Sequence, residues 1–218
     1  MSNYLQFMQQ RFEDFPNQEF KIENNELIFN DLPIMDLIEE FGTPFRMTYL
    51  PKITEKIQQA QKWFKEAMGN QNYEAEYMYC YCTKSSHFEF ILNEVLKNNA
   101  HLETSSAFDI NIIESLYKKN KLTKDTYVIA NGFKRKAYTD NLTRLLNNGF
   151  HNCIPVLDNL NEIENYDQVN VNFKVGIRIA TDEEPQFNFW TSRLGVRYND
   201  VMHLYENKIA NDDRISLK

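Results

Sequence analysis

The chain has 218 residues, of which 42% are hydrophobic and 25% are charged. This composition can fill the core of a good-sized domain, so we do not expect a disordered chain. The net charge of −7 argues against a nucleic-acid partner, because no excess of basic side chains is present to neutralise phosphates. No run of about 20 apolar residues could cross a bilayer, and the first residues lack a secretory signal pattern. We therefore expect a cytoplasmic protein with no membrane partner.

Residues 1–44 differ in pattern from the rest of the chain and are predicted to form an N-terminal extension. Residues 20–29 resemble a β-hairpin, with the Asn24-Asn25 pair supplying its turn. A short helix is expected over residues 32–41, ended by Gly42. We expect this extension to pack on a second domain that the chain does not include.

From residue 45 onward, predicted strands and helices alternate. Residues 45–50 are predicted to form a strand, and Pro51 opens a long helix at a position where proline is tolerated. Further strand-like runs recur about every 20 to 27 residues, the length of a βα unit. These runs are residues 77–82, 101–103, 127–130, 153–157 and 175–179. Apolar stripes at helical spacing are Ile53, Ile57, Ala60, Phe64 and Ala67; Phe88, Ile91, Leu92 and Val95; Ile110, Ile113 and Leu116; and Tyr138, Leu142 and Leu145.

Two α/β architectures compete for this pattern. A doubly wound nucleotide-binding sheet would show a glycine-rich turn after its first strand, but no two of the six glycines lie closer than 17 residues. We therefore predict a (β/α)₈ barrel, of which residues 45–218 hold about five of the eight strands. Residues 213–218 look like the start of a sixth strand. Because an open partial barrel leaves an unpaired edge, we do not expect it to be stable alone.

Lys84 directly follows the first regular strand, at the end where barrel enzymes build their active sites. An amine desolvated in such a position can attack a carbonyl and form an imine. On position alone, however, a solvated loop lysine is the simpler interpretation, and an unrelated α/β scaffold remains open.

Five motifs in order make residues 43–200 resemble the pyridoxal-phosphate decarboxylases of ornithine, diaminopimelate and arginine, which share an alanine-racemase-type barrel. Residues 81–86 are similar to that family's Tyr-Ala-Val-Lys-Ala-Asn segment, and residues 101–110 to its strand with an acidic residue followed by Ser-Gly-Gly-Glu-Leu. The other three motifs, resembling Asn-Gly-Pro-Lys-Lys, Leu-Arg-Ile and Ser-Lys-Phe-Gly, are residues 129–135, 176–179 and 191–196. The run at residues 79–87 is most similar to a bacterial arginine decarboxylase branch.

The resemblance implies a role for four residues. Lys84 would carry pyridoxal 5'-phosphate as a Schiff base and act as the catalytic residue. Glu103, Asp109 and Arg178 align with positions near that cofactor. Each of the three also has a simpler explanation: a solvated carboxylate for Glu103, a helix cap with Ser106 for Asp109, and a structural ion pair for Arg178.

The resemblance further implies the N-terminal part of a basic amino-acid decarboxylase, converting arginine to agmatine in polyamine biosynthesis and working as a homodimer. The alternatives are a non-catalytic pyridoxal-phosphate barrel and a decarboxylase of diaminopimelate, ornithine or carboxynorspermidine. In the family, the carboxylate at the pyridine nitrogen and the phosphate cradle come from a glycine-rich loop and a Glu-Pro-Gly-Arg-like motif. Neither motif occurs by Lys218, so we expect this chain alone to bind the cofactor poorly and not to turn over.

Cys80 and Cys82 alternate along one strand and therefore point to the same side. Such a pair can bind metal, but Cys153 is the one further thiol and none of the four histidines has ligand spacing. We expect reduced, buried thiols and no metal site.

Overall fold

The computed structural model describes residues 19–180 and 194–218. The chain divides into two compact units, Met1–Thr48 and Tyr49–Lys218. No helix in the described ranges is both long and apolar enough to span a bilayer.

The first unit contains the predicted hairpin. Strand β1 (Phe20–Glu23) pairs antiparallel with β2 (Glu26–Phe29). Asn24 and Asn25 connect them with φ values of 47° and 71°, the left-handed conformation that a two-residue hairpin turn requires. The hairpin and its turn residues are confirmed.

The helix of the first unit is α2 (Ile34–Phe41). It begins two residues later than predicted, because Leu32–Pro33 forms a short strand, β3, that pairs with β2. Gly42 ends it as predicted: at φ 73° its backbone N–H donates to the carbonyl of Ile38.

The second unit alternates strands and helices. Its strands are β4 (Cys80–Cys82), β5 (His101–Thr104), β6 (Val128–Ala130), β7 (Cys153–Leu157), β8 (Phe173–Ile177) and β9 (Ile215–Leu217). Its helices are α3 (Leu50–Asn70), α4 (Glu89–Lys97), α5 (Ala107–Lys118), α6 (Lys136–Asn147) and α7 (Tyr198–Leu204), with a 3₁₀ turn η1 (Glu162–Tyr166) and a π-helical turn η2 (Tyr205–Ile209).

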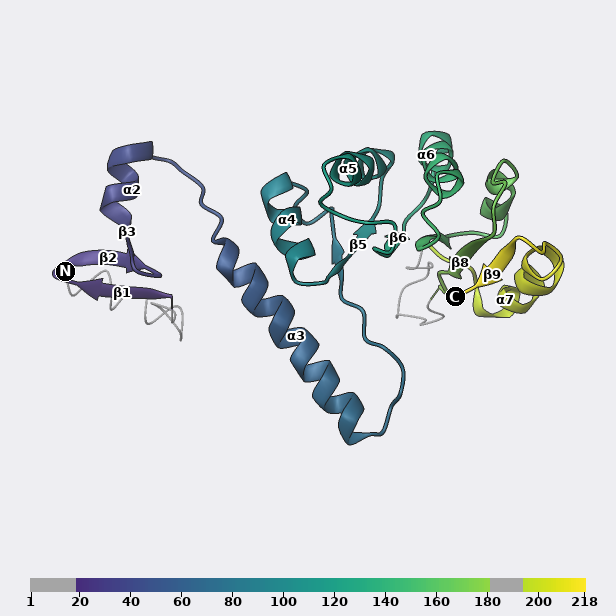
Figure 1. The fold of residues 1–218 in the computed structure, drawn as a ribbon, viewed down its shortest axis with the longest axis horizontal. Coiled ribbons are helices and arrows are strands. Elements are labelled where there is room, and N and C mark those ends of the chain that lie inside the picture. The colour runs from purple at the N-terminus through teal and green to yellow at the C-terminus, as the bar shows by residue number, and fades with distance from the viewer. Residues whose placement is uncertain (1–18, 181–193) are drawn as a thin grey trace, which may run out of the picture. The chain divides into compact units, whose positions relative to one another are not determined.

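The six strands form one parallel sheet in the order β4-β5-β6-β7-β8-β9. Each strand pairs with the next one along the chain, so every crossover advances in the same direction, and helices α4, α5 and α6 line up along the sheet (Figure 1). A doubly wound sheet would reverse its order at a switch point. The structure therefore confirms the incomplete barrel, with the expected sixth strand formed by β9; β4 and β9 lie at the two edges.

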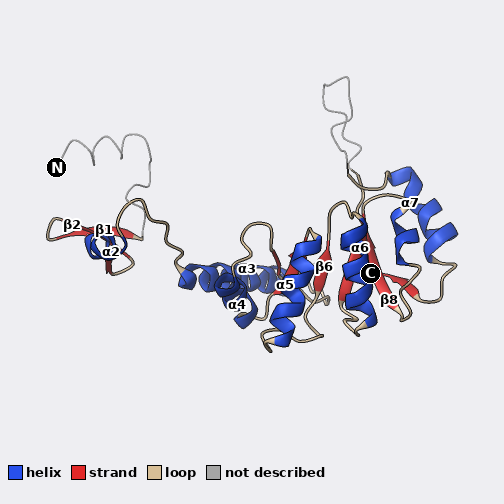
Figure 2. Cartoon of the chain, turned by 90° about the horizontal axis from the view of Figure 1, so that it is seen from above, coloured by secondary structure: helices blue, strands red, loops and turns tan. Residues whose placement is uncertain are grey.

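The two faces of this sheet differ in burial. Helices α5 and α6 lie against the sheet (Figure 2). Leu102, Val128 and Val175 are fully buried in the core that these helices share with the sheet. Glu103 and Ile129, which pair in register on the opposite face, are partly buried. This opposite face corresponds to the inside of a barrel.

The predicted strand at residues 45–50 is wrong. Leu50 is the first residue of α3, with Pro51 in its first turn as expected, and residues 45–49 belong to no sheet. Phe45 and Met47 are more than a third exposed. An apolar, β-prone run becomes a strand only where another strand is available to pair with it, and the described residues supply none.

Two predicted helical stripes are only partly buried. In α3, Ile57 is buried, whereas Phe64 is half exposed and stacks on Tyr77 with ring centroids 4.2 Å apart. Phe88 precedes α4 and is 60% exposed. The stripes of α5 and α6 are confirmed, since every predicted position there is buried.

Gly195 belongs to the last predicted motif, residues 191–196, of which residues 191–193 lie outside the described ranges. Its φ is +100°, and an added Cβ would lie 2.8 Å from the Ala180 nitrogen and 2.9 Å from the Arg178 carbonyl oxygen. We predict that Gly195→Ala lowers the free energy of unfolding by roughly 2–4 kcal/mol, through backbone strain and overlap. Urea denaturation followed by circular dichroism, in the protein that contains this chain, measures this change.

Gly69 is the matched control for this measurement. It lies in the last turn of α3 with nothing within 4 Å of an added Cβ, so Gly69→Ala should stabilise the chain by about 0.5–1 kcal/mol. Equal effects of the two substitutions would contradict the close approach at Gly195.

Candidate active site

The carboxyl ends of the parallel strands meet at one edge of the sheet, and the predicted site residues lie there. Lys84 is two residues beyond β4, Glu103 is the last residue but one of β5, Asp109 is in the first turn of α5, and Arg178 directly follows β8. The structure thus places all four predicted residues at the same end of the sheet.

A hollow of about 600 Å³ opens at this end between the loops that follow β4 and β5. Lys84 and Asp109 both line it, together with His87, Ser105, Ser106, Phe108 and Ile112. Glu103 and Arg178 do not line it. The structure therefore brings two of the four predicted residues into one hollow and leaves the other two beside it.

Lys84 is exposed, and the turn that carries it is fixed by its neighbour. Thr83 is fully buried, and both its backbone N–H and its hydroxyl donate to the Glu103 carbonyl, at 2.9 and 3.1 Å. Lys84 makes no ion pair with any side chain of the described ranges. Its amine is therefore accessible on a rigid support, which an attacking nucleophile requires.

Glu103 lies on the inner face of the sheet, directly across from Cys82 in the parallel ladder. Burial, and after it the nearby Glu103 carboxylate, raises the pKa of the Cys82 thiol. Burial and Glu103 also raise the pKa of Cys80. The two same-side thiols therefore share one face with a carboxylate and stay protonated at neutral pH. Both are only partly buried, so the prediction that they are buried is wrong, whereas Cys153 is buried as predicted.

Asp109 is 6% exposed and caps α5. Its carboxylate accepts the backbone N–H of Ser105 at 2.9 Å, and its own N–H donates to the Ser106 hydroxyl at 3.3 Å. This reciprocal arrangement satisfies donors at the helix start. The predicted cap is confirmed, and a cofactor contact of Asp109 stays a prediction.

Arg178 pairs with a carboxylate that the sequence did not indicate. Its guanidinium lies 3.4 Å from the carboxylate of Asp158, whose side chain is 3% exposed, while the Arg178 side chain is 37% exposed. The arginine is thus anchored at one side and accessible at the other.

The sequence also missed a buried ion pair, Lys134–Glu162, at 2.7 Å. Lys134 stands in the motif at residues 129–135, but no spacing in the sequence signalled its partner. Burial lowers the pKa of Lys134 and raises that of Glu162, and the attraction between the two charges opposes both shifts.

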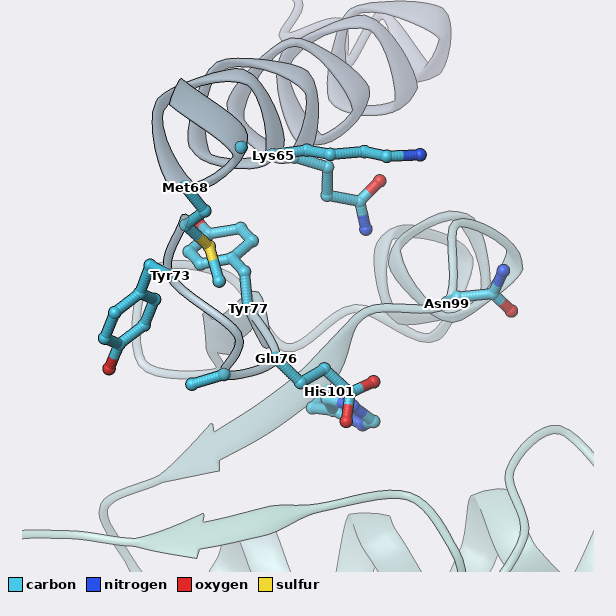
Figure 3. A pocket seen from close by; sticks show the side chains of 10 residues that line it. Lys65, Met68, Tyr73, Glu76, Tyr77, Asn99 and His101 are labelled. Atoms are coloured by element: carbon cyan, nitrogen blue, oxygen red, sulfur yellow. The ribbon is translucent and has the colours of Figure 1, made fainter. Parts of the chain in front are cut away.

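A second hollow, of about 450 Å³, lies at the amino end of the sheet, between the end of α3, the loop before β4 and the start of β5 (Figure 3). Lys65, Tyr73, Glu76 and His101 are among its lining residues, and none of these is buried. The described ranges contain no group of three or more His, Cys, Asp or Glu residues able to hold a metal ion. The hollow at Lys84 therefore remains the best-supported site.

No family model and no curated protein matches the sequence, but solved structures resemble the fold. A diaminopimelate decarboxylase from M. jannaschii, in complex with L-lysine, has a TM-score of 0.73 and 15% identity over 92% of this chain and 46% of its own. The biosynthetic arginine decarboxylase from Campylobacter jejuni has a TM-score of 0.65 and 18% identity over 89% and 33%. A mutant of SrLDC solved in complex with PLP has a TM-score of 0.56 and 16% identity over 86% and 42%. The chain thus spans less than half of each structure, and the likeness shows a shared fold.

The position of Glu103 beside Cys82 can be tested by thiol alkylation. Glu103→Gln removes the negative charge that helps to raise the Cys82 pKa, so more thiolate forms at a given pH. We expect iodoacetamide to modify Cys82 about threefold faster in this variant at pH 8, measured by peptide mapping.

Two internal controls accompany this measurement. Burial raises the pKa of Cys153 to about 12, so this thiol should stay unmodified in the folded chain. Glu114→Gln alters a carboxylate that pairs with Arg144 on the helical layer and should leave Cys82 unchanged. An unaltered Cys82 rate in Glu103→Gln would place the carboxylate away from the thiol.

Proposed function

We propose that Lys84 carries pyridoxal 5'-phosphate in a decarboxylase of basic amino acids, of which this chain forms the N-terminal part. The observation that carries this proposal is the exposed amine of Lys84, set on a rigid turn at the carboxyl end of the first strand of a sequentially ordered parallel sheet. Barrel enzymes place reactive groups at this end, and the motif around Lys84 resembles the cofactor-binding segment of these decarboxylases.

The residues of the site fit this cofactor. Lys84 offers an accessible primary amine for the cofactor's aldehyde, and the hollow of about 600 Å³ beside it can hold a small planar ring. The hydroxyls of Ser105 and Ser106 line the same hollow, and a hydroxyl can donate to an anion. The accessible side of Arg178 suits a phosphate or carboxylate group.

When bound, pyridoxal phosphate would supply the electron sink that decarboxylation requires. The residues of the protein would hold the cofactor and return a proton to the substrate. Lys84 would hold the cofactor and, once a substrate amine has displaced it, its Nζ would deliver a proton to the substrate Cα. Glu103, on the strand next to Lys84, would supply a negative charge near the site, and burial would keep the Cys82 thiol protonated and out of the reaction.

Arginine, converted to agmatine, is the substrate that we propose, because residues 79–87 are most similar to the arginine decarboxylase branch. Diaminopimelate, ornithine and carboxynorspermidine are the competing substrates. The proposal includes a cytoplasmic homodimer acting in polyamine biosynthesis, with residues 1–44 packing on a further domain.

Covalent trapping tests the role of Lys84. We expect borohydride reduction of the chain in the presence of pyridoxal phosphate to leave a pyridoxyl group on Lys84, found by peptide mapping. Reduction captures even a weakly populated Schiff base, so the experiment works although this chain alone should bind poorly. Lys84→Ala should reduce the labelling of that peptide at least about tenfold.

Lys97 and Lys136 are matched controls for trapping, because both are exposed surface lysines held in helical ion pairs. Replacing either with alanine should leave the Lys84 label unchanged. Equal labelling of all three lysines would indicate non-specific chemistry and remove the basis of the proposal.

Substrate choice is tested in the protein that contains this chain. We expect carbon dioxide release from arginine to exceed that from ornithine, lysine and diaminopimelate by about a hundredfold in kcat/KM, because a site built for a guanidinium leaves polar groups unpaired with other substrates. The 218-residue chain alone should release none. A preference for another substrate would correct the assignment, whereas no release from any of them would favour a non-catalytic barrel.

A further inference from the structure

Lys134 and Glu162 form a buried ion pair, with nitrogen and oxygen 2.7 Å apart. Its side chains are 0% and 1% exposed. The Lys134 ammonium donates to the carbonyls of Gly132 and Val156, at 2.9 and 2.5 Å, besides pairing with Glu162. Two of its N–H groups thus donate to backbone carbonyls, and its contact with Glu162 is an ion pair. The second carboxylate oxygen of Glu162 accepts the backbone N–H of Asp158 at 3.1 Å.

This pair connects three separate segments. Lys134 belongs to the loop between β6 and α6, Val156 to β7, and Glu162 to the turn η1 that comes after β7. A well-packed apolar pair could fill the same space with equal or greater stability, because burying two charges costs desolvation energy. An apolar pair makes no directional hydrogen bonds. The hydrogen bonds of Lys134 and Glu162, in contrast, fix the position of the Asp158 backbone relative to β6 and β7.

Asp158, whose backbone is held in this way, contacts Arg178 through its side chain. The carboxylate of Asp158 is the acceptor that holds the Arg178 guanidinium, at 3.4 Å, and its carbonyl accepts the backbone N–H of Gly195 at 3.0 Å. Because Asp158 is 4% exposed, it has little freedom to move independently of Glu162. The order of contacts is therefore Lys134, Glu162, Asp158, Arg178.

We propose that Lys134 and Glu162 are positioning residues that orient Arg178 toward an anionic group of the cofactor or substrate at the carboxyl end of the sheet. The proposal rests on the proposed function for the identity of the ligand. The orientation of Arg178 itself is a property of the chain without any ligand. Neither Lys134 nor Glu162 touches the ligand; both act through Asp158.

Paired substitutions distinguish an effect on the orientation of Arg178 from a general loss of folding. Lys134→Met with Glu162→Leu removes both charges together, so no unpaired charge stays buried, but it also removes the acceptor for Asp158. Lys134→Met with Glu162→Gln removes the same charges and keeps an amide oxygen that can accept the Asp158 N–H. Glu162→Asp, which keeps the charge but shortens its reach, is the second test if the leucine variant does not fold.

The first readout is the rate at which phenylglyoxal modifies Arg178 in the protein that contains this chain. The rate is measured by peptide mapping without cofactor, at a temperature where circular dichroism shows each variant folded. We expect the methionine–leucine variant to react about tenfold faster than the wild type, as for the loss of one buried hydrogen bond. The methionine–glutamine variant should stay within about twofold. Asp158→Asn serves as the positive control, because it removes the carboxylate that holds the arginine.

The second readout is the pyridoxal phosphate concentration that gives half-maximal trapping on Lys84. We expect the methionine–leucine variant to need about ten times more cofactor and the methionine–glutamine variant to need about the wild-type concentration. Glu114→Leu with Arg144→Met, which removes a partly exposed ion pair between α5 and α6, should change neither readout.

The outcomes distinguish the two proposals. If wild-type Lys84 is not trapped, the proposed function fails, while the phenylglyoxal rates still test the contacts that orient Arg178. If Lys84 is trapped but a folded methionine–leucine variant shows wild-type values in both readouts, the positioning role is overturned. Equal acceleration of Arg178 in the leucine and glutamine variants would also overturn it, because the acceptor for Asp158 would then be irrelevant.

Discussion

Parallel strand pairing is the constraint that determines the arrangement of the second unit. A parallel neighbour can be reached only by a crossover, and here each crossover leads to the adjacent strand. Helices therefore cover one face, and the carboxyl ends of all strands meet at one edge. That edge brings residues as distant in sequence as Lys84 and Arg178 to the same end of the sheet, although neither depends on the other for its local conformation.

Most of the order of strands and helices could be predicted from the sequence, because strand-like runs and helical stripes are both local patterns. Strand-like runs and helical stripes depend on neighbouring residues, and Ile110, Ile113 and Leu142 are buried as their spacing requires. The errors arise where burial depends on a distant partner. Residues 45–49 pair with no strand, and Phe45 and Met47 are more than a third exposed. Phe88 fits the stripe of α4, yet it is 60% exposed.

The site was predictable only to the level of which end of the sheet it occupies. Lys84, Glu103, Asp109 and Arg178 were expected there from a resemblance, and they lie there. Their individual environments were not predictable, because these depend on contacts between loops. Lys134 and Glu162 are polar residues in loops, a pattern typical of solvated positions, and only the adjacency of β6 and β7 turns them into a buried pair.

The polar groups at the carboxyl end fall into two classes with different consequences for chemistry. Asp109, Lys134 and Glu162 direct their charged atoms at backbone groups or at each other, so they determine where the loops lie and have little left for a ligand. Lys84 and Arg178 are accessible. The Arg178 guanidinium pairs with Asp158, and the backbone that carries Lys84 is anchored by the hydrogen bonds from Thr83 to the Glu103 carbonyl. An accessible cation on a rigid support retains its position when an anionic ligand arrives, so little ordering entropy is lost on binding. Among the described residues at this end, Lys84 and Arg178 therefore keep charged atoms accessible to an anionic ligand, whereas the buried groups determine where the loops lie.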